Sequence, residues 1–176
     1  MKITFLAPHI KIAGGTRAFL TYADLLAKKG HEVVVVVPIQ NFLKRVVGSI
    51  IRRKPTWFKD FHATIKWASD YSERHIPDAD VVVATAWQTA EPVASYNSSK
   101  GRKFYLIQHY ESLYHGAPEK VDATYKLPLH KIVISTWLKG IMKEKFNSDS
   151  DLIVTPVDFG LFHYVEGARK EKPLHH

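Results

Sequence analysis

Short hydrophobic runs alternate with amphipathic segments along most of the chain. The runs, rich in β-branched residues, lie at residues 3–7, 33–37, 80–85, 103–108, 131–135 and 151–155, with a weaker one at 63–67. Segments with helical spacing lie between them, at residues 16–29, 89–96, 117–125 and 136–146. Strands that alternate with helices are typical of a parallel sheet covered by helices. The pattern therefore predicts an α/β fold, a doubly wound, mainly parallel, Rossmann-like sheet with helices on both faces.

A glycine pair lies in the loop between the first run and the first helix. Thr16 is predicted to cap this helix, and Gly30 to end it. Glycines let a ligand approach the backbone closely, and the free N–H groups of a helix start attract anions. Gly14, Gly15, Thr16 and Arg17 are therefore an expected anion site, although a plain tight turn explains the loop equally well. The spacing matches neither G-x-G-x-x-G nor a P-loop.

Polar and aromatic residues directly follow two of the predicted strands. Trp87 follows the run at 80–85, whereas His109, Tyr110 and Glu111 follow the run at 103–108. Ligands of open α/β sheets bind outside the carboxyl ends of the strands, so these residues are expected at the ligand edge. Each residue also has a simpler explanation. Trp87 can pack on the sheet, and His109 can be an ordinary loop histidine. Tyr110 can belong to an aromatic loop, and Glu111 can be a solvated carboxylate.

Composition narrows the class of protein. The chain has 176 residues, which suits one domain, and its 45% hydrophobic content excludes a disordered tail, a collagen or a coiled coil. The absence of cysteine excludes a disulfide scaffold and a cysteine nucleophile. No H-x-x-x-H, H-E-x-x-H or G-x-S-x-G motif occurs, so neither a metal site nor an α/β-hydrolase is expected. No run is long enough for a signal peptide or a membrane span, and the expected location is the cytoplasm.

The excess of positive charge is concentrated in one segment. The formal net charge is +8, and residues 40–59 hold six basic residues and no acidic one. The segment also carries a hydrophobic helical face at residues 42–51. Such a basic amphipathic helix can dock on anionic lipid, at the inner face of the membrane, or simply pack on the sheet with a solvated rim. Nucleic acid is not an expected partner, because no nucleic-acid-binding signature is present.

Four segments resemble family 4 glycosyltransferases of the GT-B fold. The start of the chain has a strand, a Gly-Gly loop and Leu-Ala-Lys-Lys-Gly-His-Glu-Val at 26–33. Ser-Thr-Trp-Leu-Lys at 135–139 is similar to the family's Ser-x-x-Leu-Lys helix. Residues 155–162 resemble its Asn-Gly-Val-Asp-x-x-x-Phe segment, with Thr-Pro in place of Asn-Gly. Tyr-Leu-Ile-Gln-His-Tyr-Glu at 105–111 resembles the rhamnosyltransferase-like branch.

The resemblance implies one half of a two-domain enzyme. Residues 1–162 would form the N-terminal, acceptor-side domain, and residues 163–176 the start of a linker with a possible tag remnant. The C-terminal donor domain would be absent, so this fragment alone is expected to be inactive. The whole enzyme would transfer a sugar from a nucleotide-sugar donor to a glycan or lipid-linked acceptor, with retention and without a metal ion or other cofactor.

The resemblance also assigns roles to the residues singled out above. His109 would be catalytic; Gly14, Gly15, Thr16 and Arg17 would face the donor diphosphate; and Trp87, Tyr110 and Glu111 would contact the acceptor. Two other functions remain open on the sequence. One is a non-catalytic Rossmann-like module that binds a nucleotide or a glycan, and the other is half of a sugar-nucleotide epimerase, which would act without an acceptor.

Overall fold

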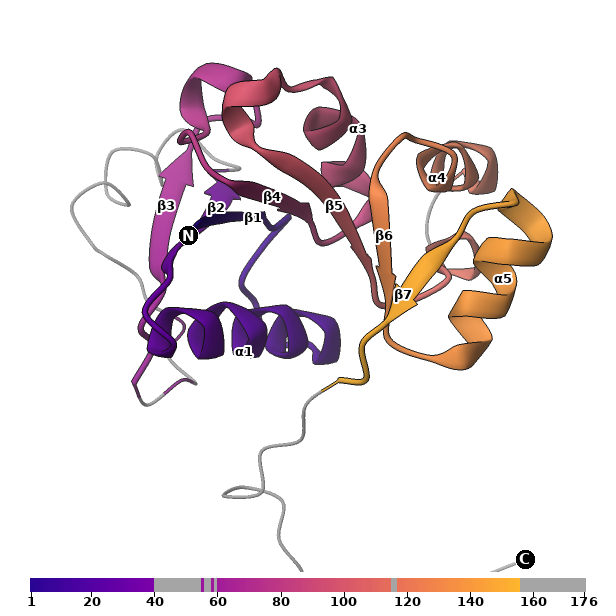
Figure 1. Cartoon of the computed structure of the whole chain (residues 1–176), viewed down its shortest axis with the longest axis horizontal. Helices are drawn as coiled ribbons and strands as arrows, with labels where there is room; N and C mark the ends of the chain where they lie inside the picture. Colours follow the sequence, from indigo (N-terminus) through magenta and orange to yellow (C-terminus); the bar gives the residue numbers. More distant parts are fainter. Residues whose placement is uncertain (40–54, 56–57, 59, 115–116, 156–176) are drawn as a thin grey trace, which may run out of the picture.

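The computed structural model describes residues 1–39, 55, 58, 60–114 and 117–155, and its centre is a seven-stranded parallel sheet (Figure 1). The strands are β1 (Lys2–Leu6), β2 (Glu32–Pro38), β3 (Thr64–Ala68), β4 (Val81–Ala84), β5 (Arg102–Ile107), β6 (His130–Val133) and β7 (Ser150–Leu152). Their order is β3-β2-β1-β4-β5-β6-β7, and every neighbouring pair is parallel. The predicted Rossmann-like α/β fold is confirmed, with a sheet that is wholly rather than mainly parallel.

Helices cover both faces of the sheet, as expected for a doubly wound fold. They are α1 (Gly14–Lys28), α3 (Trp87–Ser95), α4 (Pro118–Tyr125) and α5 (Thr136–Phe146), joined by the short 3₁₀ turns η1 (Glu73–His75), η2 (Ser98–Lys100) and η3 (Glu111–Leu113). One hydrophobic core lies under α1, and a second lies under α3, α4 and α5. The two cores share the sheet between them, so the central strands are buried on both faces.

The valine run of β2 shows how the sequence produces this arrangement. Val35 and Val37 contribute to the core under α1, whereas Val36 contributes to the core on the opposite face. Successive side chains of a strand point to opposite faces, so an unbroken run of valines buries both. Val35 and Val36 are completely buried, so this strand is covered on both faces.

The ends of α1 differ in how well the sequence predicts them. Gly30 has a φ of +86° and its N–H bonds to the carbonyl of Ala27, so it ends the helix as predicted. The prediction that Thr16 caps the helix is wrong, because Ala13 occupies the cap position and Gly14 is the first helical residue. Thr16 therefore lies within the first turn, where its side chain is buried.

Two further expectations change or lie outside the described residues. The helix predicted at 89–96 begins two residues earlier, at Trp87, and Pro92 lies inside it. The basic segment at 40–59, apart from Pro55 and Phe58, lies outside the described residues, as do residues 156–176. The domain limits, the possible lipid contact and the motif at 155–162 therefore stay predictions.

Candidate functional site

The strand order reverses between β1 and β4. From β1 the chain continues outward through β2 to β3, and from β4 it continues in the other direction to β7. In open α/β sheets this switch point opens a crevice at the carboxyl ends of the strands, where ligands bind. The loops that follow β1, β4 and β5 border this crevice, and they carry the residues predicted from the sequence.

Two hydroxyl groups fix the end of β1 at the switch point. Thr85, just after β4, donates to the carbonyl of Leu6 at 2.8 Å. Tyr71, from the loop after β3, donates to the carbonyl of Ala7 at 2.8 Å. Burial raises the pKa of the Tyr71 hydroxyl, so it stays protonated and keeps donating. The loop that leads to α1 therefore leaves the sheet from a fixed point.

The start of α1 is open at this edge. Among the described residues, no side chain caps the helix at Ala13, and its first turn contains no acidic residue. Gly14 and Gly15 are exposed, and nothing described lies within 4 Å of a Cβ placed on Gly14. A Cβ on Gly15 would lie 3.6 Å from the Oε1 atom of Gln108. Helix N–H groups without a partner attract anions, so this turn can hold a phosphate group.

The structure adds His9, which the sequence analysis missed, to this turn. The Nδ1 atom of His9 lies 3.5 Å from the Oγ1 atom of Thr16, which ties the loop after β1 to the helix. Burial, followed by the charge of Lys11, lowers the pKa of His9, so the ring is neutral at pH 7. A lone histidine in a loop has no spacing that signals this contact. Arg17, in the same turn of α1, is half-buried.

His109 lies exposed at the carboxyl end of β5, as predicted. Its ring meets the ring of Tyr114 edge to face, with centroids 4.5 Å apart. The preceding residue, Gln108, faces Gly15, so the loop after β5 and the start of α1 lie side by side. The structure therefore brings the predicted catalytic histidine and the glycine pair to the same edge of the crevice.

Glu111 is engaged within the protein rather than solvated. Its Oε2 atom accepts a hydrogen bond from the backbone N–H of Trp87 at 2.9 Å and lies 3.4 Å from the Tyr105 hydroxyl. Its own N–H donates to the Tyr125 hydroxyl at 3.0 Å. Burial raises the pKa of Glu111, although the hydrogen bond from Trp87 opposes the shift. The carboxylate caps α3, and its contact with an acceptor stays a prediction.

Trp87 and Tyr110 pack toward the interior. Trp87 is half-buried against the core under α3, α4 and α5. Tyr110 is only 6% exposed, and its hydroxyl donates to Asp122 at 3.2 Å. The ammonium of Lys145 lies 4.9 Å from the centre of the Tyr110 ring. The acceptor contacts predicted for both aromatic residues stay predictions, and for Tyr110 they would require the ring to leave this packing.

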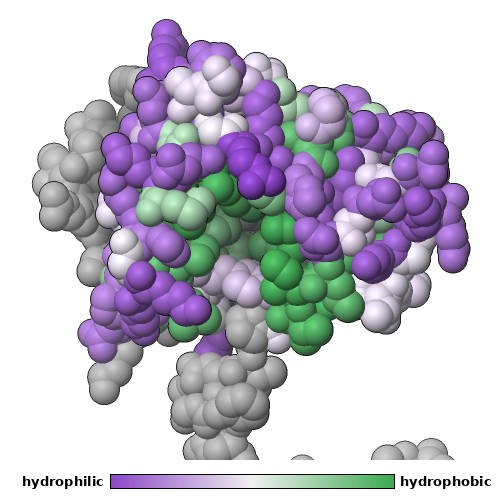
Figure 2. Space-filling view, viewed as in Figure 1, coloured by the Kyte–Doolittle hydropathy of each residue, from purple (hydrophilic) through white to green (hydrophobic). Residues whose placement is uncertain are grey.

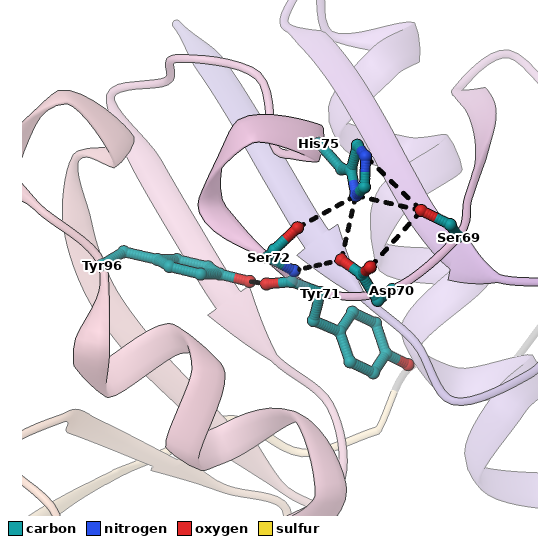
Figure 3. Close-up of polar contacts among 6 residues, drawn as sticks. All are labelled: Ser69, Asp70, Tyr71, Ser72, His75 and Tyr96. Carbon is teal, nitrogen blue, oxygen red and sulfur yellow. Dashed lines mark hydrogen bonds and ion pairs between the residues drawn. The ribbon is translucent and has the colours of Figure 1, made fainter.

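A second polar cluster follows β3 at the same edge (Figure 3). Asp70 accepts hydrogen bonds from the Ser72 N–H at 2.7 Å and from Nδ1 of His75 at 2.9 Å. The hydrogen bonds from Ser72, and then the bond from His75, hold the pKa of Asp70 well below its usual range. The carboxylate therefore stays ionised and braces the turn that leads into η1.

This cluster contains two serines, a histidine and an aspartate, but its geometry is not that of a nucleophile and its base. The Oγ atom of Ser72 lies 3.1 Å from Nδ1 of His75, but that nitrogen donates to Asp70 at 2.9 Å and so cannot accept the Ser72 proton. The Oγ atom of Ser69 lies 3.3 Å from Nδ1 and 3.4 Å from Nε2 of His75. An atom equally far from both nitrogens is not aligned with the lone pair of either one. Tyr96 also donates to the carbonyl of Tyr71 at 2.6 Å. The cluster thus holds Tyr71 where it can reach the end of β1.

Large hydrophobic side chains are exposed along the same edge. They follow β1, β5, β6 and β7, and they are Ile12, Leu113, Tyr114, Trp137, Ile153 and Val154. Ile12 is 77% exposed and Val154 is 72% exposed. The surface beside the end of β7 is hydrophobic, as the green area in Figure 2 shows. Exposed hydrophobic surface of this kind marks contacts with other protein or with ligand.

The described part of the chain contains neither a cluster of metal-binding side chains nor a membrane-spanning helix. Within it, no group of three or more His, Asp or Glu side chains is arranged to hold a metal ion. None of the helices in the same ranges is both long and apolar enough to cross a membrane.

Comparison with known proteins identifies the fold. Two solved structures of an alpha-glucosyltransferase match, one in complex with UDP-glucose and DNA containing an abasic site, the other with UDP and a 13-mer DNA containing a central A:G mismatch. The first has a TM-score of 0.55 and 15% identity, over 90% of this chain and 43% of that one. The second has a TM-score of 0.54 and 15% identity, over 91% and 42%. No family model and no curated protein matches the chain. The chain thus has the fold of half of a GT-B enzyme and spans less than half the length of the glucosyltransferase that it matches.

Proposed function

We propose that the chain is one half of a glycosyltransferase that transfers a sugar from a nucleotide-sugar donor to an acceptor. The observation that carries this proposal is the uncapped start of α1 at the switch point of the sheet, in a fold that matches half of a GT-B enzyme. The matching enzyme was solved with UDP-glucose, which is a nucleotide-sugar. A diphosphate is the ligand group that the open helix start suits best.

The reaction itself suits the groups at this edge. When the sugar leaves the donor, negative charge develops on the nucleoside diphosphate and must be stabilised. We assign this role to the backbone amides of Gly14, Gly15 and Thr16 and to the side chain of Arg17. These groups are the contribution of this half, and the proposed reaction uses no metal ion or other cofactor. The exposed ring of His109, beside them, would act at the reacting sugar.

The acceptor and the second domain belong to the same proposal. The hydrophobic side chains at the carboxyl ends of β1, β5, β6 and β7 suit contact with a second domain across the crevice. The resemblance to family 4, and to its rhamnosyltransferase-like branch, favours a glycan or lipid-linked acceptor and retention of configuration. It also favours a cytoplasmic enzyme at the inner face of the membrane. The solved glucosyltransferase holds DNA, so a DNA duplex belongs in the panel of test acceptors.

A titration followed by amide NMR shifts tests the donor site. The chain is titrated with UDP, GDP and dTDP and with a sugar derivative of each. The expected result is a set of shifts centred on Gly14, Gly15, Thr16 and His109. Shifts centred on the cluster at Ser69–His75 instead would move the ligand site away from α1. A spectrum that changes with none of these ligands would contradict the donor site proposed for this half.

A further inference from the structure

Gln108 presents an unsatisfied polar atom beside the start of α1. Its Oε1 atom is buried, and no described residue donates a hydrogen bond to it. The same atom lies 3.6 Å from the position of a Cβ on Gly15, and Nε2 lies 3.7 Å from that position. The amide thus lies flat against the glycine whose backbone faces the proposed diphosphate.

An unpaired buried oxygen of this kind needs an explanation. Buried polar groups in proteins nearly always have a hydrogen-bond partner, because leaving one unpaired reduces stability. If the amide served only the fold, an apolar side chain of the same shape could take its place without loss of stability. Exceptions occur at functional sites, where the protein gives up some stability for binding.

The chemistry of the atom restricts the ligand group that it can bind. A carboxamide oxygen only accepts hydrogen bonds, so its partner must carry a donor. A deprotonated diphosphate offers no donor to this oxygen, whereas the hydroxyls of the donor sugar and of the nucleoside do, and only those of the donor sugar are missing from the bare diphosphate. The last torsion of a glutamine side chain is soft, so a small rotation can turn the oxygen from Gly15 toward the crevice.

We infer that Gln108 is a specificity-determining residue, whose amide accepts a hydrogen bond from a hydroxyl of the donor sugar while the diphosphate lies at the start of α1. The inference rests on the proposed function and deepens it. Two tasks are then divided between neighbouring groups at the carboxyl ends of the strands. The helix start binds any nucleoside diphosphate, and Gln108 distinguishes the sugar-bearing form from the bare diphosphate.

The test uses Gln108→Met, which keeps the length of the side chain and removes the amide. Gln88→Met is the matched control, because Gln88 is exposed in the first turn of α3 at the same edge. Two quantities are measured on the whole chain. One is the thermal unfolding midpoint without ligand, and the other is the ratio of the affinities for UDP-glucose and UDP, repeated with GDP-mannose and GDP and with dTDP-glucose and dTDP.

The expected result is that Gln108→Met unfolds at the wild-type temperature or above it. Its preference for the sugar-bearing ligand falls by about 3- to 10-fold, the effect of losing one neutral hydrogen bond. Its affinity for the bare diphosphate changes less than about twofold, and Gln88→Met behaves like wild type.

Three results would overturn the inference. A lower unfolding midpoint, in Gln108→Met but not in Gln88→Met, would show that the amide supports the fold. An unchanged preference, or a wild-type chain that has none, would show that the amide does not contact the sugar. In both cases shifts at Gly14–Thr16 on adding UDP would leave the proposed function standing. A wild-type chain that binds no nucleotide at all would contradict the proposed function and this inference together.

Discussion

The carboxylate of Glu111 accepts a hydrogen bond at 2.9 Å from the backbone N–H of Trp87, 24 residues earlier in the chain. Trp87 is the first residue of α3, and the cap position before it is occupied by Ala86, which has no polar side chain. A residue of the loop after β5 therefore caps a helix that follows β4. Because the same loop carries His109, one carboxylate fixes two sides of the crevice.

Replacing Glu111 tests this cap. Glu111→Ala removes the acceptor from the half-buried Trp87 N–H, so we expect a loss of about 1–3 kcal/mol in the free energy of unfolding. Glu111→Gln keeps an acceptor oxygen and should lose about 1 kcal/mol or less. Urea unfolding at neutral pH measures both. Equal losses in the two variants would show that the charge, rather than the acceptor, stabilises the helix.

The raised pKa of Glu111 also predicts a pH dependence. Burial, the largest cause, makes the folded state hold this proton at a higher pH than the unfolded state does. Between the ordinary pKa of about 4.3 and the raised value, the folded state therefore binds more protons, and stability falls as the pH rises. The free energy of unfolding of the wild type should thus decline relative to that of Glu111→Gln across this window. A constant difference between pH 4 and pH 8 would mean that the carboxyl is not perturbed.

The cap at α3 shows why sequence predicts the fold better than the site. The valine run of β2 and the glycine that ends α1 are local signals, because burial on both faces and a positive φ each leave a mark on neighbouring residues. The partner of Glu111 lies 24 residues away, and its contact with Trp87 exists only once β4 and β5 are paired. No spacing along the chain encodes that contact.

The loop after β5 shows a second limit. His109 and Tyr110 are neighbours at the carboxyl end of one strand, so the sequence places both at the ligand edge. In the structure His109 is exposed, whereas Tyr110 is buried with its hydroxyl on Asp122 of α4. Which of two adjacent aromatic side chains turns inward depends on the helix that packs beside the loop. Thr16 is a similar case, because the path of the loop from β1 decides which residue becomes the cap.

Gly14→Ala separates stability from ligand binding. A Cβ at Gly14 meets nothing described within 4 Å, and alanine favours a helix more than glycine does, so we expect unchanged stability or a gain of up to about 1 kcal/mol. The same methyl group would lie where the proposed diphosphate approaches the backbone, so nucleotide affinity should fall. Thermal unfolding and a nucleotide titration measure the two effects. A higher unfolding temperature with unchanged nucleotide affinity would show that Gly14 is not part of the ligand site.

The lowered pKa of Asp24 predicts that the free energy of unfolding falls in acid. This buried residue of α1 accepts hydrogen bonds from Lys28 at 2.8 Å and from the backbone N–H of His62 at 2.8 Å. Burial raises its pKa, but these bonds outweigh burial and the net pKa is lowered. Its contribution is therefore present above the ordinary Asp pKa of about 3.9 and is lost as the pH falls through the lower folded value.

Asp24→Asn should therefore cost about 1–3 kcal/mol at pH 7, and the difference from wild type should shrink as the pH falls below 4. Asp60→Asn is the control, because Asp60 is exposed and lies two residues before His62. Urea unfolding from pH 7 to pH 2.5 gives both curves. A difference that persists unchanged in acid would assign the effect to the shape of the side chain instead of its charge.

Two glycines with positive φ should respond very differently to alanine. Gly101, with a φ of +84°, would place a Cβ 2.3 Å from the backbone carbon of Asp80, where strands β4 and β5 begin. Gly30 has a φ of +86°, but nothing described lies within 4 Å of its Cβ position. We expect Gly30→Ala to cost about 1–2 kcal/mol from backbone strain alone and Gly101→Ala to cost more than about 3 kcal/mol. Thermal unfolding compares the pair, and equal losses would show that the backbone at Gly101 moves freely.

His109→Ala tests the catalytic role proposed for the loop after β5. Among the described residues the exposed ring contacts Tyr114 edge to face, so removing it should change the stability of the fold by less than about 1 kcal/mol. In a protein that joins this chain to a donor domain, turnover should fall by about 10²-fold or more, the loss typical of a group that acts at the reacting atoms. Nucleotide-sugar affinity should change by less than about threefold, because the diphosphate is bound at α1.

His31→Ala is the control, since His31 precedes β2 at the opposite edge of the sheet. Equal turnover in the two variants would make His109 an ordinary loop residue, and a parallel loss of affinity and turnover would assign it to binding.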